Sequence, residues 1–315
     1  MSAHHNAGFR RLFETDRLSF GTGFPLTNAD ESAPDVDAEV RLARRAEELG
    51  YDALWARDVP TFWPSFGDAG QTFDVWPWLT RMATATDDVA LGTASVVLTL
   101  RHPLHVAKAA ASVDRLSDGR LVLGVATGDR DPEFPAFDVD PDDRGHLFRE
   151  AVGLLRTVWA EEFPEADTSW GTLDGDLSVV PEPTTETVPL LPTGHARQTV
   201  DWIGDHGDGW LFYHLPESTL ESYLDDWRAA AGDKPFAMAM QVDLADDPTA
   251  DPEHVHQGFR AGTEWFREYV RDLEDAGVDH LLVGLRGDDP ERELERFASE
   301  VMEPVQATGT DGSDR

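Results

Sequence analysis

The sequence contains no cysteine and only two lysines, Lys108 and Lys234. The absence of cysteine excludes disulfides, thiolate nucleophiles, zinc–thiolate sites and iron–sulfur clusters. No apolar run approaches the ~18 residues that a membrane-spanning helix needs. The N-terminal stretch also lacks the apolar segment of an export signal. We therefore expect a cytoplasmic protein without membrane contacts.

Basic residues are scarce in general, with 26 Lys and Arg against 61 Asp and Glu, for a formal net charge of −35. The acidic residues are spread along the whole chain, so the charge belongs to the folded surface. Such a surface repels nucleic acids and anionic membranes, and we expect neither as a partner. An acidic surface with almost no lysine is typical of proteins from salt-loving organisms. It predicts stability that rises with KCl concentration beyond the ordinary screening range.

The apolar pattern alternates between short strand-like runs and longer helical runs, which predicts parallel βαβ units. Eight alternations in one chain favour an α/β fold with a closed (β/α)8 TIM barrel over an open doubly wound sheet. Gly21 and Gly23 begin a dinucleotide-binding pattern, but Leu26 stands where its third glycine should be. The expected strands are 18–24, 52–56, 89–95, 120–125, 189–193, 209–213, 236–243 and 279–283. The expected helices are 35–49, 73–86, 103–115, 144–160, 195–205, 216–231, 257–276 and 290–305.

The sequence predicts a single barrel domain over residues 16–305. Residues 161–188 are rich in Pro, Gly, Thr and Asp, and they predict an excursion with a short hairpin after the fourth βα unit. Residues 1–15 are expected to be a flexible N-terminus, and residues 306–315 a disordered tail.

In a barrel of this kind the active site lies where the strands end, on the βα loops. The candidate loops are 21–24, 57–60, 94–97, 127–130, 194–198 and 213–214. In the fifth of these, Gly194 allows close backbone approach, the amides that follow begin a helix, and Arg197 can supply a counter-charge. This pattern favours a phosphate site, and the alternative is an ordinary turn with a surface arginine.

Two further loops have distinctive chemistry. Residues 127–132 combine glycine with mixed charges, which suits a polar pocket wall or a solvated loop. Aromatic residues follow the second strand densely enough to form a flat apolar pocket, although the last of them are better explained as core. These aromatic residues are Trp55, Phe62, Trp63, Phe66, Phe73, Trp76 and Trp78. His254 and His256 have metal-binding spacing but do not end a strand, so we expect no metal site.

The segment 89–125, beginning VALGTASVVLTLRHP and ending DRLSDGRLVLGV, resembles the central segment of the luciferase-like monooxygenase family. The stretches WARDVP at 55–60, GDAGQ at 67–71 and GDR at 128–130 are similar to one flavin oxidoreductase branch of that family. The resemblance extends from about residue 16 to residue 305.

The resemblance implies FMN at the barrel mouth, or in some branches a deazaflavin coenzyme. It places the cofactor phosphate at Gly194, His195, Ala196 and Arg197. The ring would cross the ends of the first four strands. The resemblance further implies a bulge with a non-proline cis peptide behind the ring. The residues at the ring are then Gly23, Thr127 and the bulge residues Ala94 and Ser95. The substrate would enter from the side of Trp55, Arg57, Phe62 and the excursion.

One departure from luciferase itself concerns the chemistry. Luciferase has a Glu-His-His run after its second strand, where this chain has Arg57, Asp58 and Val59, and the reactive cysteine is also missing. We therefore do not expect light emission. The candidates for proton transfer are Asp58, Asp129 and His102.

The leading interpretation is a flavin-dependent monooxygenase or oxidoreductase that uses reduced FMN and oxygen on a small organic substrate. A separate flavin reductase is an expected partner if the FMN is not reduced in place, and a homodimer is the expected assembly. The first alternative is a deazaflavin-dependent dehydrogenase or reductase. The second, from another functional class, is a flavin-binding protein without turnover.

Overall fold

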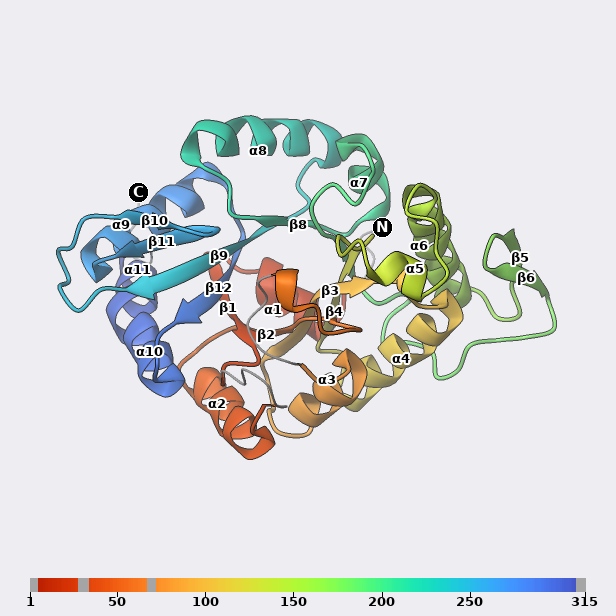
Figure 1. The fold of residues 1–315 in the computed structure, drawn as a ribbon, viewed down its shortest axis with the longest axis horizontal. Coiled ribbons are helices and arrows are strands. Elements are labelled where there is room, and N and C mark those ends of the chain that lie inside the picture. Colours follow the sequence, from red (N-terminus) through yellow and green to blue (C-terminus); the bar gives the residue numbers. More distant parts are fainter. Residues whose placement is uncertain (1–4, 28–33, 67–71, 310–315) are drawn as a thin grey trace.

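A computed structural model describes residues 5–27, 34–66 and 72–309. Eight parallel strands form a ring that helices surround, as viewed along the barrel in Figure 1. Seven of them pair in the order β9-β12-β1-β2-β3-β4-β7, and β8 pairs with β9. This arrangement confirms the predicted barrel. The barrel strands are β1 (Ser19–Phe24), β2 (Ala53–Ala56), β3 (Ala90–Val97), β4 (Leu121–Ala126), β7 (Leu190–Pro192), β8 (Trp210–Tyr213), β9 (Phe236–Leu244) and β12 (His280–Arg286).

The ring closes between β7 and β8 through a narrow seam. Thr193 and Leu211 form a single parallel bridge, and the Gly194 amide donates to the Leu211 carbonyl over 2.8 Å. The Asp208 amide donates to the Leu190 carbonyl over 2.8 Å at the other end of the seam. In contrast, β9 and β12 pair continuously from Ala237–His280 to Asp243–Arg286.

The helices that cover the ring begin where capping residues satisfy their free amides. Asp35 and Asp74 accept hydrogen bonds from the first turns of their helices, and Gly277 ends a helix with a φ of 101°. These helices are α2 (Val36–Glu48), α3 (Val75–Ala83), α4 (Pro103–Leu116), α6 (Arg144–Ala160), α7 (Val200–His206), α8 (Glu217–Ala231), α9 (Thr263–Ala276) and α10 (Pro290–Phe297). Three short helical turns lie in loops: η1 (Pro64–Phe66), η2 (Leu98–Leu100) and α5 (Glu133–Ala136). Within the described ranges, no helix has the length and apolarity to cross a bilayer.

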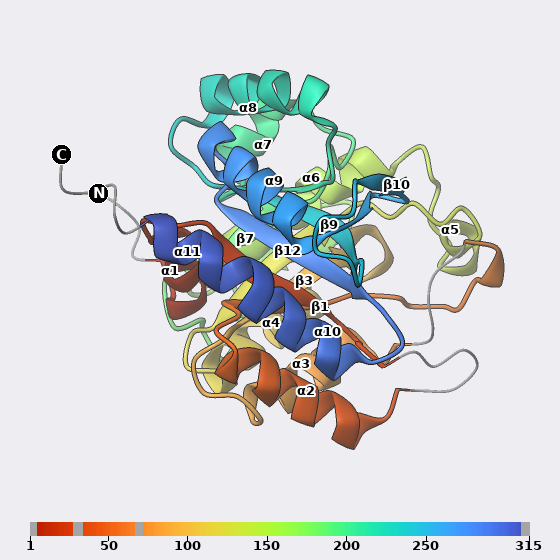
Figure 2. The ribbon, with the colours of Figure 1, turned by 90° about the vertical axis from the view of Figure 1, so that its left-hand side faces the viewer.

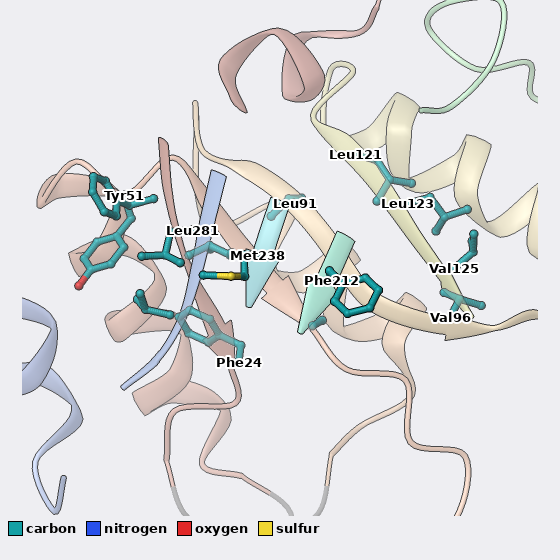
Figure 3. Close-up of a cluster of buried hydrophobic side chains, with 14 of the residues drawn as sticks. Phe24, Tyr51, Leu91, Val96, Leu121, Leu123, Val125, Phe212, Met238 and Leu281 are labelled. Carbon is teal, nitrogen blue, oxygen red and sulfur yellow. The ribbon is translucent and has the colours of Figure 1, made fainter. Parts of the chain in front are cut away.

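The core has two layers because successive strand residues point to opposite faces. Along β4, Leu121, Leu123 and Val125 pack outward against the helices, in the outer core shown in Figure 3. Val122, between them, belongs to a separate inner cluster inside the barrel. The buried residues of the inner cluster include two aromatic side chains, Phe9 and Trp55, together with small or aliphatic ones. The outer layer therefore provides most of the buried apolar surface, and the inner layer fills the space around the barrel axis.

The N-terminal segment is not flexible as predicted, because Ala7–Phe13 form the helix α1. Asn6 caps this helix, and its side-chain amide donates to Asp114 Oδ1 over 2.9 Å and to the Leu121 carbonyl over 2.7 Å. Phe9 and Leu12 are buried in the inner cluster. These tertiary contacts fix a helix too short to be stable alone. Residues 1–4 lie outside the described part of the chain.

The C-terminal end also differs from the prediction. After α10 a π-helical turn, η3 (Ala298–Met302), leads into α11 (Glu303–Gly309), so the chain stays helical past residue 305. The part of the expected tail at 310–315 lies outside the described residues.

Two hairpins interrupt the barrel pattern. The excursion at 161–188 contains β5 (Glu165–Thr168) and β6 (Gly171–Asp174), an antiparallel pair that projects from the barrel in Figure 1, as expected. The second hairpin joins β10 (Glu253–Val255) to β11 (Gly258–Ala261), where the sequence predicted that a helix begins. That prediction was wrong at its start because β11 pairs with the end of β9, and α9 begins only at Thr263.

Candidate active site

The carboxyl ends of the strands form the barrel mouth, which lies on the opposite side of the molecule from α1 (Figure 2). Arg57, Asp129 and Tyr213 follow or end β2, β4 and β8, and they interact electrostatically there. Burial raises the pKa of the Asp129 carboxyl, and the charge of Arg57 partly offsets that rise. Burial also raises the pKa of the Tyr213 hydroxyl and lowers that of Arg57. These three side chains form the charged cluster of the mouth.

Two of the three predicted proton-transfer residues make structural hydrogen bonds. The Asp58 carboxylate is buried and accepts hydrogen bonds from Arg101 Nη2 over 2.7 Å and Arg101 Nε over 3.0 Å. It also accepts from the Val97 amide over 3.2 Å. His102 caps α4 through its Nδ1, and its Nε2 lies 3.0 Å from the Trp170 carbonyl. Their polar atoms are thus engaged in structural contacts, and a proton-transfer role for either residue stays a prediction.

Trp55, predicted to lie on the substrate side, fills the interior of the barrel. Its side chain is buried, and Nε1 donates to His280 Nε2 over 2.9 Å. Gly21 and Gly92 leave space for the indole, and a Cβ added at Gly92 would lie 2.2 Å from it. The ring thus forms a plug below the mouth, and its contact with a substrate stays a prediction.

Small side chains face the barrel axis above this plug. Gly23 is the next-to-last residue of β1, and Ala94 on β3 and Ala239 on β9 pack over the inner cluster. The Ala94–Ser95 bond is a non-proline cis peptide, and the pairing of β3 with β4 shifts register between Thr93 and Val96. The bulge expected at this position is therefore present. Ser95 Oγ hydrogen-bonds Thr193 Oγ1, which ties the bulge to the end of β7.

The predicted phosphate loop is a tight turn of left-handed residues rather than the start of a helix. Gly194, Ala196 and Arg197 have φ values of 57°, 45° and 57°, and α7 begins only at Val200. His195 packs its ring edge-on against Trp210 and Phe212, whereas Arg197 is exposed. Gly194 lies against the Tyr213 ring, so this turn borders the charged cluster.

Thr127, the last predicted cofactor residue, is buried at the end of β4, and its carbonyl accepts a hydrogen bond from Thr99 Oγ1 over 2.8 Å. A glycine with a φ of 81°, Gly128, then turns the chain so that Asp129 reaches the mouth. Asp129 is the one predicted proton-transfer residue that the fold brings into the charged cluster.

Hydrogen bonds at the mouth connect the loop after β2 to the loop after β4. Thr61 Oγ1 donates to Glu133 Oε1 over 2.8 Å, and Arg130 Nη1 donates to the Thr61 carbonyl over 3.1 Å. The Arg130 guanidinium also lies 4.7 Å from the centre of the Phe66 ring. We call these contacts the rim latch. Phe62, predicted to meet the substrate, lies next to Thr61 and is exposed.

The sequence analysis missed Tyr213 and Arg130 as individual site residues. For Tyr213 a signal existed: the alternation in the sequence WLFY puts it in phase with the inward-facing Leu211. For Arg130 the candidate loop 127–130 was a signal, but its contact with Phe66 was not predictable because the two residues are distant in the sequence.

Comparisons with known proteins agree on the family of this chain. The sequence profile of the luciferase-like monooxygenase family matches residues 18–297. An F420-dependent glucose-6-phosphate dehydrogenase from Beutenbergia cavernae is 29% identical over 301 residues, covering 87% of this chain and 86% of its own. An F420-dependent hydroxymycolic acid dehydrogenase from Mycobacterium tuberculosis is 28% identical over 216 residues, covering 66% of this chain and 58% of its own.

Solved structures share the fold at lower sequence identity. An F420-dependent secondary alcohol dehydrogenase, in complex with an F420–acetone adduct, superposes with a TM-score of 0.76 at 21% identity and covers 92% of this chain and 99% of its own. A monooxygenase from Streptomyces bottropensis superposes with a TM-score of 0.75 at 20% identity and covers 91% of this chain and 99% of its own.

Proposed function

The chain belongs to the luciferase-like monooxygenase family, and we propose that within it the protein is a deazaflavin (F420)-dependent oxidoreductase. The reaction is hydride transfer between the coenzyme and the reacting carbon of a small alcohol or carbonyl compound. The observation that carries this proposal is the set of F420-dependent enzymes among its relatives in sequence. They favour the deazaflavin alternative over FMN and oxygen, which the sequence analysis had placed first. The separate flavin reductase is then not required, because the substrate supplies the hydride.

The residues at the mouth fit a cofactor with a flat ring and a phosphate. Gly23, Ala94 and Ala239 present at most a methyl group toward the axis, so a ring could lie across the strand ends. The turn at Gly194 exposes backbone, and Arg197 beside it offers a positive charge on a strongly acidic protein. FMN and F420 share these requirements, and the choice between them therefore comes from the relatives.

When bound, the deazaflavin supplies a ring carbon that accepts or donates a hydride. For alcohol oxidation, the hydroxyl proton must leave as the hydride departs, and we assign Asp129 as its acceptor. Burial raises the pKa of this carboxyl, which moves its proton affinity closer to that needed for transfer near neutral pH. Arg57 and Tyr213 flank the carboxylate, hold it at the mouth, and orient a hydroxyl or carbonyl oxygen beside it. Trp55 closes the barrel from below and excludes water.

The test compares the two cofactors on the same purified protein. Fluorescence titration should show tighter binding of F420 than of FMN. Anaerobic addition of a secondary alcohol should then bleach the long-wavelength absorbance of the oxidised deazaflavin. Tighter binding of FMN, accompanied by substrate-dependent oxygen consumption, would overturn the proposal and restore the monooxygenase interpretation.

A further inference from the structure

Aromatic side chains are exposed around the mouth. Phe62 and Phe66 lie on the loop after β2, Phe137 follows α5 on the loop after β4, and Tyr213 ends β8; their exposed fractions are 48%, 38%, 40% and 43%. The rim latch holds the first two in place, because Arg130 packs on the Phe66 ring and bonds the Thr61 carbonyl. Exposed apolar groups gathered next to a reactive site are typical of a binding surface.

Four arginines of the described mouth loops already have partners. Arg101 pairs with Asp58 over 2.7 Å and with Asp74 over 3.0 Å. Arg57 lies beside Asp129, and Arg130 is engaged in the rim latch. Arg144 donates to the Gly128 carbonyl over 3.3 Å and lies over the Phe134 ring at 5.2 Å. A substrate phosphate would have to take one of these cations from its present partner.

The other segments that follow barrel strands in the sequence add mostly acidic charge. The sequence between β1 and α2 includes Asp30, Glu31 and Asp35 but no lysine or arginine, and residues 67–71 contain Asp68 and no basic residue. After β9 the nearest arginine, Arg260, pairs with Asp243 over 3.1 Å. A phosphorylated substrate would therefore approach an acidic rim. Among the described residues, the cations there also include Arg197, at the proposed cofactor phosphate, and Arg286, which ends β12 and donates to Gln241 Oε1 over 3.3 Å.

We propose that the substrate is an uncharged alcohol or ketone with an apolar body that rests against Phe62 and Phe66, and not a phosphorylated sugar. This inference rests on the proposed function for the hydride transfer, but it concerns the rim rather than the cofactor. It separates this protein from the Beutenbergia cavernae relative, which is named for glucose 6-phosphate.

Three probes of similar size test the inference: cyclohexanol, glucose and glucose 6-phosphate. Saturation-transfer NMR on the protein, with and without F420, measures binding whether or not turnover occurs. We expect cyclohexanol to bind and glucose 6-phosphate not to. In turnover with F420, kcat/KM for cyclohexanol should exceed that for glucose 6-phosphate by at least about tenfold, since removing an anion from water without a partner is costly.

Variants of the rim identify which residues are responsible. Phe62→Ala and Phe66→Ala should each raise KM for cyclohexanol about fivefold to tenfold, because an apolar contact is lost. They should change kcat little, and KM for isopropanol less, because that alcohol is too small to reach them. The matched control is Phe163→Ala: this phenylalanine is 50% exposed but lies beside the β5–β6 hairpin, so its loss should leave both constants unchanged.

The outcomes separate the two proposals. Preference for glucose 6-phosphate would overturn the substrate inference while hydride transfer to F420 stands. If F420 is never reduced but cyclohexanol still binds in a Phe62-dependent way, the proposed function fails and the substrate inference stands. If Phe62→Ala and Phe66→Ala instead dissociate a dimer in light scattering without changing cyclohexanol binding, the rim is an interface between copies, and the inference is overturned.

Discussion

The closed end of the barrel and its mouth both contain arginines, carboxylates and aromatic rings, but they arrange them differently. At the closed end, the buried Arg120 guanidinium donates to Ser117, Thr86, Val89 and Ala83 over 2.8 to 3.0 Å. At the mouth, the Asp129 carboxyl has a raised pKa and an exposed face. The difference indicates that the Arg120 network at the closed end serves stability, whereas the exposed Asp129 at the mouth is the group to which we assign a role in the chemistry.

The largest effect should come from Arg120→Ala at the closed end. The change leaves buried carbonyl and hydroxyl groups of Ala83, Thr86, Val89 and Ser117 without their donor, and each unpaired group carries a cost. We expect a loss of about 3–5 kcal/mol in the free energy of unfolding, measured in urea at constant salt. As a control, Arg130→Ala at the mouth should cost less stability and affect KM instead. Equal losses of stability would contradict the division between the two ends.

The next effect concerns pH and His280, which lies at the centre of the inner core. Its Nε2 accepts from Trp55, so Nδ1 carries the proton and lies 2.7 Å from Ser19 Oγ, which in turn donates to the Leu12 carbonyl. Burial lowers the pKa of His280 from 6.5 to about 4, so the folded state favours the neutral ring. The stability that this provides is complete above pH 6.5 and is lost as the pH falls toward 4.

The loss should reach about 3 kcal/mol by pH 4 relative to a His280→Gln variant, which has no titrating ring. Unfolding of both proteins across this pH range gives the comparison, since carboxylates elsewhere titrate equally in both. A difference that does not change with pH would mean that the ring is not held neutral.

At the mouth, Asp129→Asn should lower kcat/KM for alcohol oxidation by about 100-fold, because the proton acceptor is lost. Stability should change by less than about 0.5 kcal/mol, as is usual for an exposed group. In the unmodified enzyme the rate should rise with pH through the raised pKa of Asp129, and that acidic limb should vanish in the variant. Asp131→Asn, two residues away and also exposed, is the matched control and should keep the limb. Equal losses in both variants would refute a specific role for Asp129.

The smallest effect is expected for Arg197→Ala on the turn after β7. Loss of a charge-assisted contact should weaken cofactor binding by about 1–3 kcal/mol without affecting the fold. Arg115→Ala on α4, whose Nε bonds the Glu182 carbonyl over 2.7 Å away from the turn, controls for the general loss of positive charge. Unchanged affinity in Arg197→Ala would show that the turn is not a phosphate site.

The sequence predicted all eight barrel strands because parallel strands buried on both faces are near-continuous apolar runs, as in residues 121–126. It missed α1 because a seven-residue helix depends on tertiary contacts, here those of Asn6 with Asp114 and Leu121. The β10–β11 hairpin was missed for a similar reason, since β11 depends on pairing with β9.

For the site, the sequence identified the loops but not the orientation of their side chains. Asp58 and Asp129 both follow strands, yet Asp58 meets Arg101 and turns inward, whereas Asp129 stays at the mouth. That distinction depends on partners many residues away, which local patterns do not encode. Trp55 shows the same limit, because its inward direction becomes clear only with Gly21, Gly92 and His280 around it.

The narrow seam between β7 and β8 makes this barrel a rolled sheet whose two edges meet at few atoms. Local opening should begin there, so the amides of Gly194 and Asp208 should exchange with solvent before those that join β9 to β12. The Gly194 turn and the Tyr213 ring stand on the two sides of this seam. A ligand that contacts both sides would hold the two edges together. The seam should therefore open less often in the ligand-bound barrel than in the free barrel.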